Sequence, residues 1–480
     1  MRIVNGLADF SNSEVHYIMK KMILTVIGGG SVNWMRGLMR DIYLVDEFSG
    51  GEIRLVDPKL DHTQSVAAML HKFNELRGKD YKISIVEDRR EALKDADFVL
   101  MTFSPGAMEA YYNDIEIPVK YGIRQPVSMT VGPCGISAAV RTIPVCYDIV
   151  KEMEELCPGA WVLNYTNPMS VLTRAMFMAS KTVKVLGMCH GFHDFGHLAG
   201  PLLGLPKPEG MGLLEYLYHW LPEQGLEYKV AGLNHFIFLT KAELNGRDML
   251  PVVREYCKKF RDLGEGTGKT EGNESPFRSD MGAAFAICRQ LGYIPINADR
   301  HTIEFWPSLC NVRNGYGMKY GVQKTTVDYR NLMKIHQKNH IDNVAKGITS
   351  VDWSYSGEEM VEIIKAIANG TSFRGIVNVP NKGQISNLPK DVIVETFGVI
   401  TKDGVIPEDS GELPGSIGTL SRLHADIHEL TVRAALEGSR ELFIEALSLD
   451  PLSAGADFCE IPQMAEELLE ANKQWLPRFF

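Results

Sequence analysis

The sequence predicts an α/β protein in which a parallel sheet is covered by helices. The 480 residues are 45% hydrophobic and 23% charged, an ordinary globular composition with enough length for a large core. Over roughly the first 200 residues, apolar strand-like runs alternate with longer helical patterns, as in a doubly wound sheet. The first such run ends in a glycine triplet and the second ends at Asp57, which are features of a Rossmann-like dinucleotide site.

The N-terminal part is expected to contribute the strands of the parallel sheet. They are, in order, Met22–Ile27, Glu52–Val56, Tyr81–Val86 (an edge strand), Asp97–Thr102, Ala160–Asn164 and Val183–Met188. A helical pattern, Trp34–Tyr43, follows the first of them. The last four strands end in polar or Gly/Pro-rich turns, where open α/β sheets bind their ligands.

The pattern changes after about Gly200, and a mixed α+β region is expected. Its elements are a strand pair or long strand at Tyr228–Leu239, a Gly/Glu-rich loop at Glu265–Asn273, helices at Asp280–Gly292 and Thr325–Val344, strands at Phe373–Val379 and Val392–Phe397, and helices at Gly418–Leu447 and Pro462–Trp475. We therefore divide the chain into an N-terminal extension (1–18), a Rossmann-like domain (19–200) and a mixed α+β domain (201–480).

Charge and cysteine usage restrict the classes of partner. A formal net charge of −10 argues against nucleic-acid or anionic-membrane binding, since both need a basic surface. No run approaches the roughly 20 apolar residues of a membrane helix. The first eighteen residues lack the basic start and apolar stretch of a signal peptide. The eight cysteines are scattered, so a cytoplasmic protein without a disulfide framework is expected.

A dinucleotide site is expected at the turn after the first strand. Gly28 and Gly30 allow the backbone to approach a pyrophosphate, which would lie at the N-terminus of the following helix, and Ser31 supplies a hydroxyl. Asp57 would accept hydrogen bonds from the ribose hydroxyls and repel a 2′-phosphate, which favours NAD over NADP. Asn33 replaces the third glycine of the fingerprint, and a glycine turn alone also serves steric needs.

Polar motifs follow the glycine turn in a definite order. They are Asn-Tyr-Thr-Asn-Pro-Met at 164–169, Cys-His-Gly-Phe at 189–192 and Gly-Leu-Asn-His at 232–235, with Gly-Pro-Cys-Gly at 132–135, Arg-Thr-Ile-Pro at 141–144 and Val-Pro-Asn-Lys-Gly at 379–383. From about residue 22 to the C-terminal helices, this ordered set resembles glycoside hydrolase family 4. The resemblance implies a lactate/malate dehydrogenase-like fold, NAD, a divalent metal that is usually Mn²⁺, and a homo-oligomer (dimer or tetramer).

The metal ligands implied by this resemblance are Cys189 and His235. A thiolate and an imidazole can together bind a first-row divalent ion, with sugar hydroxyls in the open positions. Without the resemblance, the spacing of 46 residues (235 − 189) is not that of a zinc finger, and a buried cysteine and a core histidine would be the simpler interpretation.

The resemblance also implies catalytic roles. His190 corresponds to the general acid that protonates the leaving oxygen, the alternative being a histidine that only orients metal or substrate. Asp299 is the expected base, with Asp280 as the fallback, and the alternative for Asp299 is a structural pair with Arg300 or His301. Asn167 matches the sugar-binding asparagine of the family, although it could be a plain turn residue. At Met129 the family commonly has an acidic residue, so one sugar contact is missing or comes from elsewhere.

The substrate expectation depends on the tetrapeptide Cys-His-Gly-Phe, which resembles the α-glucuronidase type. Cys-His-Ser relatives are typically α-galactosidases and Cys-His-Glu-Val relatives α-galacturonidases, and both activities stay open as alternatives. A uronate needs cationic or amide donors for its carboxylate, for which Arg300 is the main candidate, with Arg124, Gln125 and His301 beside it.

The chemistry implied is oxidation at C3 of the sugar, removal of the C2 proton, expulsion of the C1 substituent, addition of water, and return of the hydride. A lactate- or malate-type dehydrogenase is a different class of explanation, but it would need no Cys/His metal pair and would release NADH. A non-catalytic NAD-binding regulator is a third. The polar motifs at expected strand ends argue against it.

Overall fold

The computed structural model describes residues 21–263, 276–277 and 279–480. Within this part of the chain, twelve strands form one sheet in the order β3-β2-β1-β4-β5-β6-β10-β11-β7-β8-β9, with β12 paired to β11. The strands are β1 (Ile23–Ile27), β2 (Glu52–Val56), β3 (Lys82–Ile85), β4 (Phe98–Met101), β5 (Trp161–Asn164), β6 (Lys184–Gly187), β7 (Leu226–Leu233), β8 (Phe236–Leu244), β9 (Arg247–Asp248), β10 (Ser372–Pro380), β11 (Ile393–Thr401) and β12 (Gly404–Pro407).

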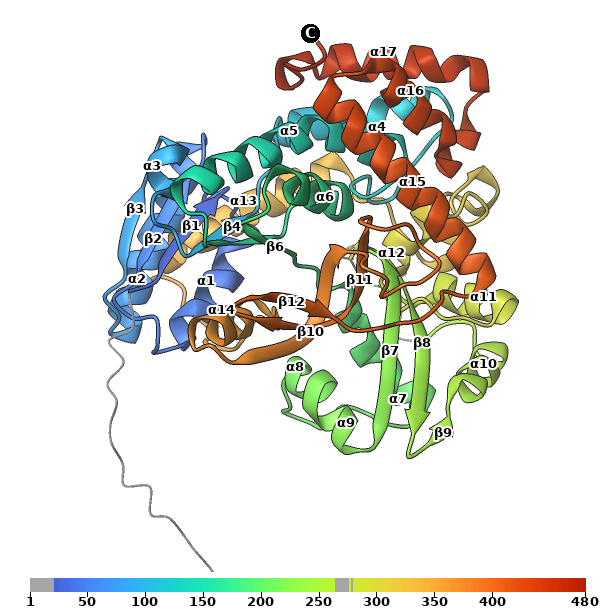
Figure 1. Cartoon of the computed structure of the whole chain (residues 1–480), viewed down its shortest axis with the longest axis horizontal. Coiled ribbons are helices and arrows are strands. Elements are labelled where there is room, and N and C mark those ends of the chain that lie inside the picture. The colour runs from blue at the N-terminus through green and yellow to red at the C-terminus, as the bar shows by residue number, and fades with distance from the viewer. Residues whose placement is uncertain (1–20, 264–275, 278) are drawn as a thin grey trace, which may run out of the picture.

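The helices lie on both faces of this sheet (Figure 1). They are α1 (Met35–Leu44), α2 (Leu60–Arg77), α3 (Arg89–Leu93), α4 (Ala107–Lys120), α5 (Gly132–Leu156), α6 (Met169–Ala179), α7 (Phe195–Leu203), α8 (Leu213–Glu215), α9 (Leu221–Glu223), α10 (Leu250–Lys259), α11 (Gly282–Leu291), α12 (Asp299–Thr302), α13 (Val327–Ala345), α14 (Met360–Ala368), α15 (Gly415–Glu437), α16 (Arg440–Leu449) and α17 (Ile461–Ala471). In the described residues, no helix is long and apolar enough to cross a membrane.

The six N-terminal strands are parallel, which confirms the α/β prediction. β1 pairs with β2 on one side and β4 on the other, and β5 and β6 continue the sheet. All residues of β4 and β5 are buried. Their unbroken apolar character follows from the helices that cover both faces, as is usual for parallel strands.

The C-terminal strands extend the same sheet with antiparallel pairing. β10 joins the parallel half through a single pair, Asn378 with Gly187 of β6, and β11 pairs with β10 over its whole length. β11 meets β7 at Glu395 and Thr396, and β7 and β8 form a hairpin where the sequence predicted a strand pair or a long strand. The predicted Gly/Glu-rich loop lies outside the described residues.

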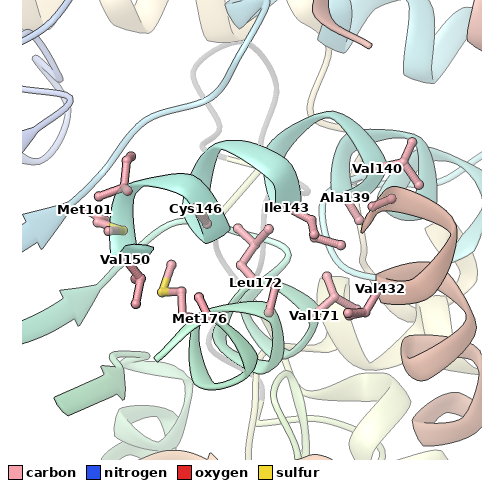
Figure 2. Close-up of a cluster of buried hydrophobic side chains, with 14 of the residues drawn as sticks. Met101, Ala139, Val140, Ile143, Cys146, Val150, Val171, Leu172, Met176 and Val432 are labelled. Carbon is pink, nitrogen blue, oxygen red and sulfur yellow. The ribbon is translucent and has the colours of Figure 1, made fainter. Parts of the chain in front are cut away.

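One layer of core packing lies between α5, α6 and α15. Figure 2 shows Ile143, Cys146 and Val150 of α5 facing Leu172 and Met176 of α6. Each of these side chains is buried, and the layer continues to Val432 of α15. The C-terminal helices α15–α17 therefore pack on helices of the N-terminal half, and α13 packs on α2 in the same way. The result is a mixed sheet whose two halves share one helical covering.

Candidate active site

The glycine turn after β1 packs closely against neighbouring strands. The amides of Gly28 and Gly29 both donate to the carbonyl of Val56, at 2.8 and 3.0 Å. Gly28 has φ +93°, and a Cβ at this position would lie 2.2 Å from the carbonyl oxygen of Thr102. Because an L side chain would be strained and would clash there, the turn requires glycine.

The other predicted cofactor residues meet at this turn. Oδ2 of Asp57 accepts a hydrogen bond from the amide of Gly30 at 3.1 Å, and Oδ1 accepts one from Lys59 at 2.8 Å. Ser31 Oγ accepts a hydrogen bond from Thr102 Oγ1 at 3.2 Å. The first turn of α1 follows, and no side chain caps it. A carboxylate for ribose and a helix N-terminus for phosphate are thus placed together, as a dinucleotide requires.

Trp34 connects the glycine turn with the Cys-His motif. Its ring centroid lies 5.2 Å from that of Tyr165, in the loop after β5, and 5.9 Å from that of His190, after β6. Asn167 is partly exposed in the same loop after β5, and its Oδ1 accepts a hydrogen bond from the amide of Met169 at 3.3 Å. The structure therefore brings the cofactor turn, Asn167 and His190 to one region of the sheet.

Cys189 and the Asn234-His235 turn lie near each other because β6, β10, β11 and β7 are neighbours. Across these strands, Gly187, Asn378, Glu395 and Gly232 pair in one row. Glu395 Oε2 accepts a hydrogen bond from Asn234 Nδ2 at 2.7 Å. Burial, and then the charge of Glu395, raise the pKa of the Cys189 thiol well above its ordinary value.

His235 is held in an uncommon backbone conformation. It is the second residue of the two-residue turn between β7 and β8 and has φ 64°. Its Nδ1 is hydrogen-bonded to Thr130 Oγ1 at 2.8 Å, and its carbonyl accepts a hydrogen bond from Asn297 Nδ2 at 3.0 Å. With Nδ1 engaged, Nε2 is the nitrogen left for another partner. Non-glycine residues in the left-handed region are often found at functional sites.

The donor atoms of Cys189 and His235 suit a divalent transition metal. Burial lowers the pKa of His235 to about 3, so that the imidazole is neutral, as a ligand must be. Cys189 must lose its proton on binding, which a cation at the sulfur would favour. Among the described residues, no group of three or more His, Cys, Asp or Glu side chains could hold a metal. A metal on this pair would therefore need substrate or water oxygens to complete its coordination.

His190 points its ring toward an acidic residue that the sequence did not single out. Nδ1 of His190 lies 3.2 Å from Oε1 of Glu358, whose side chain is 15% exposed, whereas the His190 side chain is 56% exposed. Burial lowers the pKa of His190, but the hydrogen bond and charge of Glu358 outweigh it, and the pKa is raised. A half-exposed imidazole beside a carboxylate can donate a proton to a leaving group.

Asp299 is the first residue of α12 and is fully buried against the N-terminus of α11. Its two carboxylate oxygens accept hydrogen bonds from the amides of Ala283 and Ala284, at 2.7 and 2.9 Å. In the described part of the chain no ion pair joins Asp299 to Arg300 or His301. A purely structural role for Asp299 would therefore lie in its hydrogen bonds to α11, which the sequence did not suggest. Burial raises its pKa to about 7, which suits a general base near neutral pH. Asp280, the fallback, is also buried.

Arg300 is buried near the metal-ligand candidates. Its Nη1 donates to the carbonyl of Pro276 at 3.0 Å and its Nη2 to Thr325 Oγ1 at 2.7 Å. Nε of Arg300 and Nε of Arg330 are both buried without a hydrogen-bond partner among the described residues. Burial, and next the charge of Arg330, lower the pKa of Arg300 to about 10. Two neighbouring guanidinium groups with unused donors are suited to an anion, and we call this pair the anion pocket.

His301 and His235 join this anion pocket to the metal-ligand candidates. Their rings stack with centroids 3.9 Å apart, and the charge of Arg300 acts on both histidines. His301 Nδ1 is also buried without a partner in the described ranges. By contrast, Arg124 is exposed beside the ring of Tyr316, and the amide of Gln125 binds the backbone of Val131 and Cys134.

Comparison with known proteins decides the family. The model of family 4 glycosyl hydrolases matches residues 23–197, and that of the family's C-terminal domain matches residues 230–453. An α-galacturonidase from Thermoanaerobacter italicus is 30% identical over 94% of this chain and 97% of its own length. The chain belongs to glycosyl hydrolase family 4. The predicted resemblance is confirmed, and the chain is a glycosidase.

Other relatives of this family 4 glycosidase agree with its fold. A Bacillus subtilis α-galacturonidase is 31% identical, covering 94% of this chain and 97% of its own. The crystal structure of the lplD protein from Bacillus subtilis is 30% identical and superposes with a TM-score of 0.82, covering 93% of this chain and all of that one. A 6-phospho-α-glucosidase from gut microorganisms, solved with NAD and Mn²⁺, is 21% identical with a TM-score of 0.76, covering 96% of this chain and all of that one.

Sequence reasoning missed several side chains of this family 4 site. Glu358 contacts His190, Thr130 contacts His235, Arg330 neighbours Arg300, and Glu395 contacts Asn234. Thr130 follows Met129, the position at which the family commonly has an acidic sugar-binding residue. That departure was the one signal in the sequence that pointed to this turn. The remaining three carry no local signal, because only the folding of distant segments brings them to the site.

Proposed function

We propose that this glycosidase hydrolyses α-glucuronides. The observation that carries the proposal is the pair of neighbouring arginines, Arg300 and Arg330, whose Nε atoms lack partners among the described residues. A buried guanidinium nitrogen without a hydrogen-bond partner is costly, and the C6 carboxylate of a uronic acid would supply acceptors and a negative charge in addition to that of the nearby Glu304. A neutral hexose has no group for this pocket.

The proposal assigns the cofactors to the residues that fit them. Gly28, Gly30, Ser31 and Asp57 would hold NAD, and Cys189 with His235 would hold Mn²⁺ or another divalent transition ion. The 6-phospho-α-glucosidase of similar fold was solved with both groups, which supports this assignment. When bound, NAD supplies a hydride acceptor for C3 of the sugar, and the metal polarises the oxygens on C2 and C3.

The protein side chains then handle the protons. Asp299 takes the proton from C2 once C3 is oxidised, because a carboxyl group with a pKa near 7 exists partly as carboxylate at neutral pH. His190 gives its Nε2 proton to the glycosidic oxygen as the C1–O bond breaks. Asn167 hydrogen-bonds a sugar hydroxyl, and Arg300 with Arg330 binds the carboxylate. Water adds to C1, the proton returns to C2, and return of the hydride to C3 would restore the oxidation state of the sugar.

α-Galacturonide hydrolysis is the second candidate, since the α-galacturonidases from Thermoanaerobacter italicus and Bacillus subtilis are 30 and 31% identical. Glucuronate and galacturonate differ only at C4, and the arginine pocket would bind the carboxylate of either. The test is a set of nitrophenyl α-glycosides (glucuronide, galacturonide and galactoside) assayed with NAD⁺, Mn²⁺ and a thiol. The highest kcat/KM is expected on the glucuronide. A preference for the galacturonide would select the second candidate, and a preference for the galactoside would refute the proposal for a uronate.

A further inference from the structure

One side chain beside the catalytic centre has no role in the scheme above. Glu358 lies on the segment just before α14, far from the Cys-His motif in the sequence. Its Oε1 is 3.2 Å from Nδ1 of His190. The next residue, Glu359, approaches a different histidine, His193, whose Nε2 is 3.5 Å from Oε1 of Glu359. Two adjacent carboxylates thus meet two histidines of one loop, and only Glu358 meets the half-exposed one.

Hydrogen bonds to Ser356 and, through it, to α1 hold the backbone that carries Glu358. The amide of Glu358 donates to Ser356 Oγ at 3.1 Å, and the amide of Ser356 donates to Oδ1 of Asp41 at 2.9 Å. Ser356 Oγ also donates to Oδ2 of Asp41. Asp41 is 1% exposed on α1, the helix that begins after the glycine turn. Glu359 is anchored in turn by the hydroxyl of Tyr218.

This arrangement determines which nitrogen of His190 faces the substrate. Because a carboxylate only accepts hydrogen bonds, Nδ1 must carry the hydrogen in the contact with Glu358. Nε2 is then the nitrogen that can exchange a proton with a bound glycoside. Trp34 lies beside the ring at a centroid distance of 5.9 Å. The carboxylate, the tautomer and the ring orientation are therefore set together, as in other carboxylate–histidine pairs.

We propose that Glu358 is a positioning residue that holds His190 with Nε2 directed at the leaving oxygen. This inference rests on the proposed role of His190 as the general acid. In the step, the C1–O bond breaks and its electron pair stays on the oxygen, which takes the proton from Nε2. His190 is left neutral with its hydrogen on Nδ1, still donated to Glu358. Glu358 itself neither gains nor loses a proton.

The test compares Glu358→Gln with two references in the full-length enzyme loaded with NAD⁺ and Mn²⁺. Glu362→Gln is the matched control, since Glu362 lies on α14 but pairs with Lys365. His190→Gln alone and the double variant Glu358→Gln/His190→Gln complete a double-mutant cycle. Each enzyme is assayed on a nitrophenyl and a methyl glycoside of the preferred uronic acid, because the poorer leaving group depends more on protonation.

Glu358→Gln is expected to lower kcat on the methyl glycoside by roughly 10- to 100-fold. On the nitrophenyl glycoside the loss should stay within about threefold, with KM little changed on both. In the His190→Gln background, Glu358→Gln should have no further effect. Equal losses on both glycosides, or an undiminished effect in that background, would overturn the positioning role.

A second readout separates this inference from the proposed function. Deprotonation at C2 precedes expulsion of the leaving group, so Glu358→Gln in deuterium oxide should still place deuterium at C2 of unreacted substrate. If the wild-type enzyme cleaves no uronide, the proposed function fails. If the wild-type enzyme is active and Glu358→Gln shows no leaving-group dependence, only the positioning role fails.

Discussion

Replacing Arg300 by Gln tests the anion pocket most sharply. Nη1 and Nη2 already bind Pro276 and Thr325, so Nε is the guanidinium nitrogen without a partner among the described residues, and we expect a substrate carboxylate to use it. A hydrogen bond to a charged group is worth about 1.5–3 kcal/mol. At about 1.4 kcal/mol for each factor of ten, its loss should reduce kcat/KM on the preferred uronide roughly 10- to 150-fold.

The same substitution should leave a neutral substrate nearly unaffected. kcat/KM of Arg300→Gln on nitrophenyl α-galactoside is expected to stay within about threefold of the wild-type value, since a hydroxymethyl group cannot use the cation. Arg313→Gln is the control, because Arg313 is exposed. A thermal melt of each variant separates a folding defect from a binding defect. Equal losses on uronide and galactoside would refute the anion pocket.

Three further predictions address the metal, the base and stability. Cys189→Ser and His235→Ala should each lose the bound metal while NAD binding persists, and full metal content by elemental analysis in either variant would disprove the assignment. Asp299→Asn should abolish deuterium incorporation at C2, whereas exchange at the wild-type rate in the folded variant would restrict Asp299 to holding α11. Burial lowers the pKa of His428 to about 3, so the unfolded chain takes up a proton first as the pH falls below about 6.5. The wild-type protein should therefore lose about 1 kcal/mol of unfolding free energy through His428 between pH 6.5 and 5.5, measured by urea denaturation, and a His428→Gln variant with the same pH dependence would contradict this.

The N-terminal half could be predicted closely because its signals are local. Glu52–Val56 was predicted with the bounds that the structure shows for β2, since its alternation of charged and β-branched or apolar residues and the Asp-Pro that follows mark a strand. The glycine turn was equally local, because three successive glycines directly follow the first strand in the sequence. The resemblance to family 4 depended on short contiguous motifs, which can be identified even when the overall sequence identity is only about 30%.

The contacts between distant segments could not be predicted. Thr130 and His235 are 105 residues apart, and no periodicity indicates that a hydroxyl should meet that imidazole. The sheet order β6-β10-β11-β7 places Glu395 beside Asn234 only because strands from both ends of the chain pair in the middle. Asp299 shows the same limit, since its hydrogen bonds to the start of α11 depend on how that helix packs.

The measurement that tests the central claim most directly is cleavage of the preferred α-uronide in deuterium oxide, with NAD⁺ and Mn²⁺ present. NMR of the product reports the hydrogen at C2, and absorbance reports any NADH. Oxidation followed by elimination predicts deuterium at C2 of the released uronic acid, because the proton taken by the base exchanges with solvent. It also predicts that no NADH accumulates, since the hydride returns to C3 within each turnover. Full retention of hydrogen at C2, or stoichiometric NADH, would contradict the account.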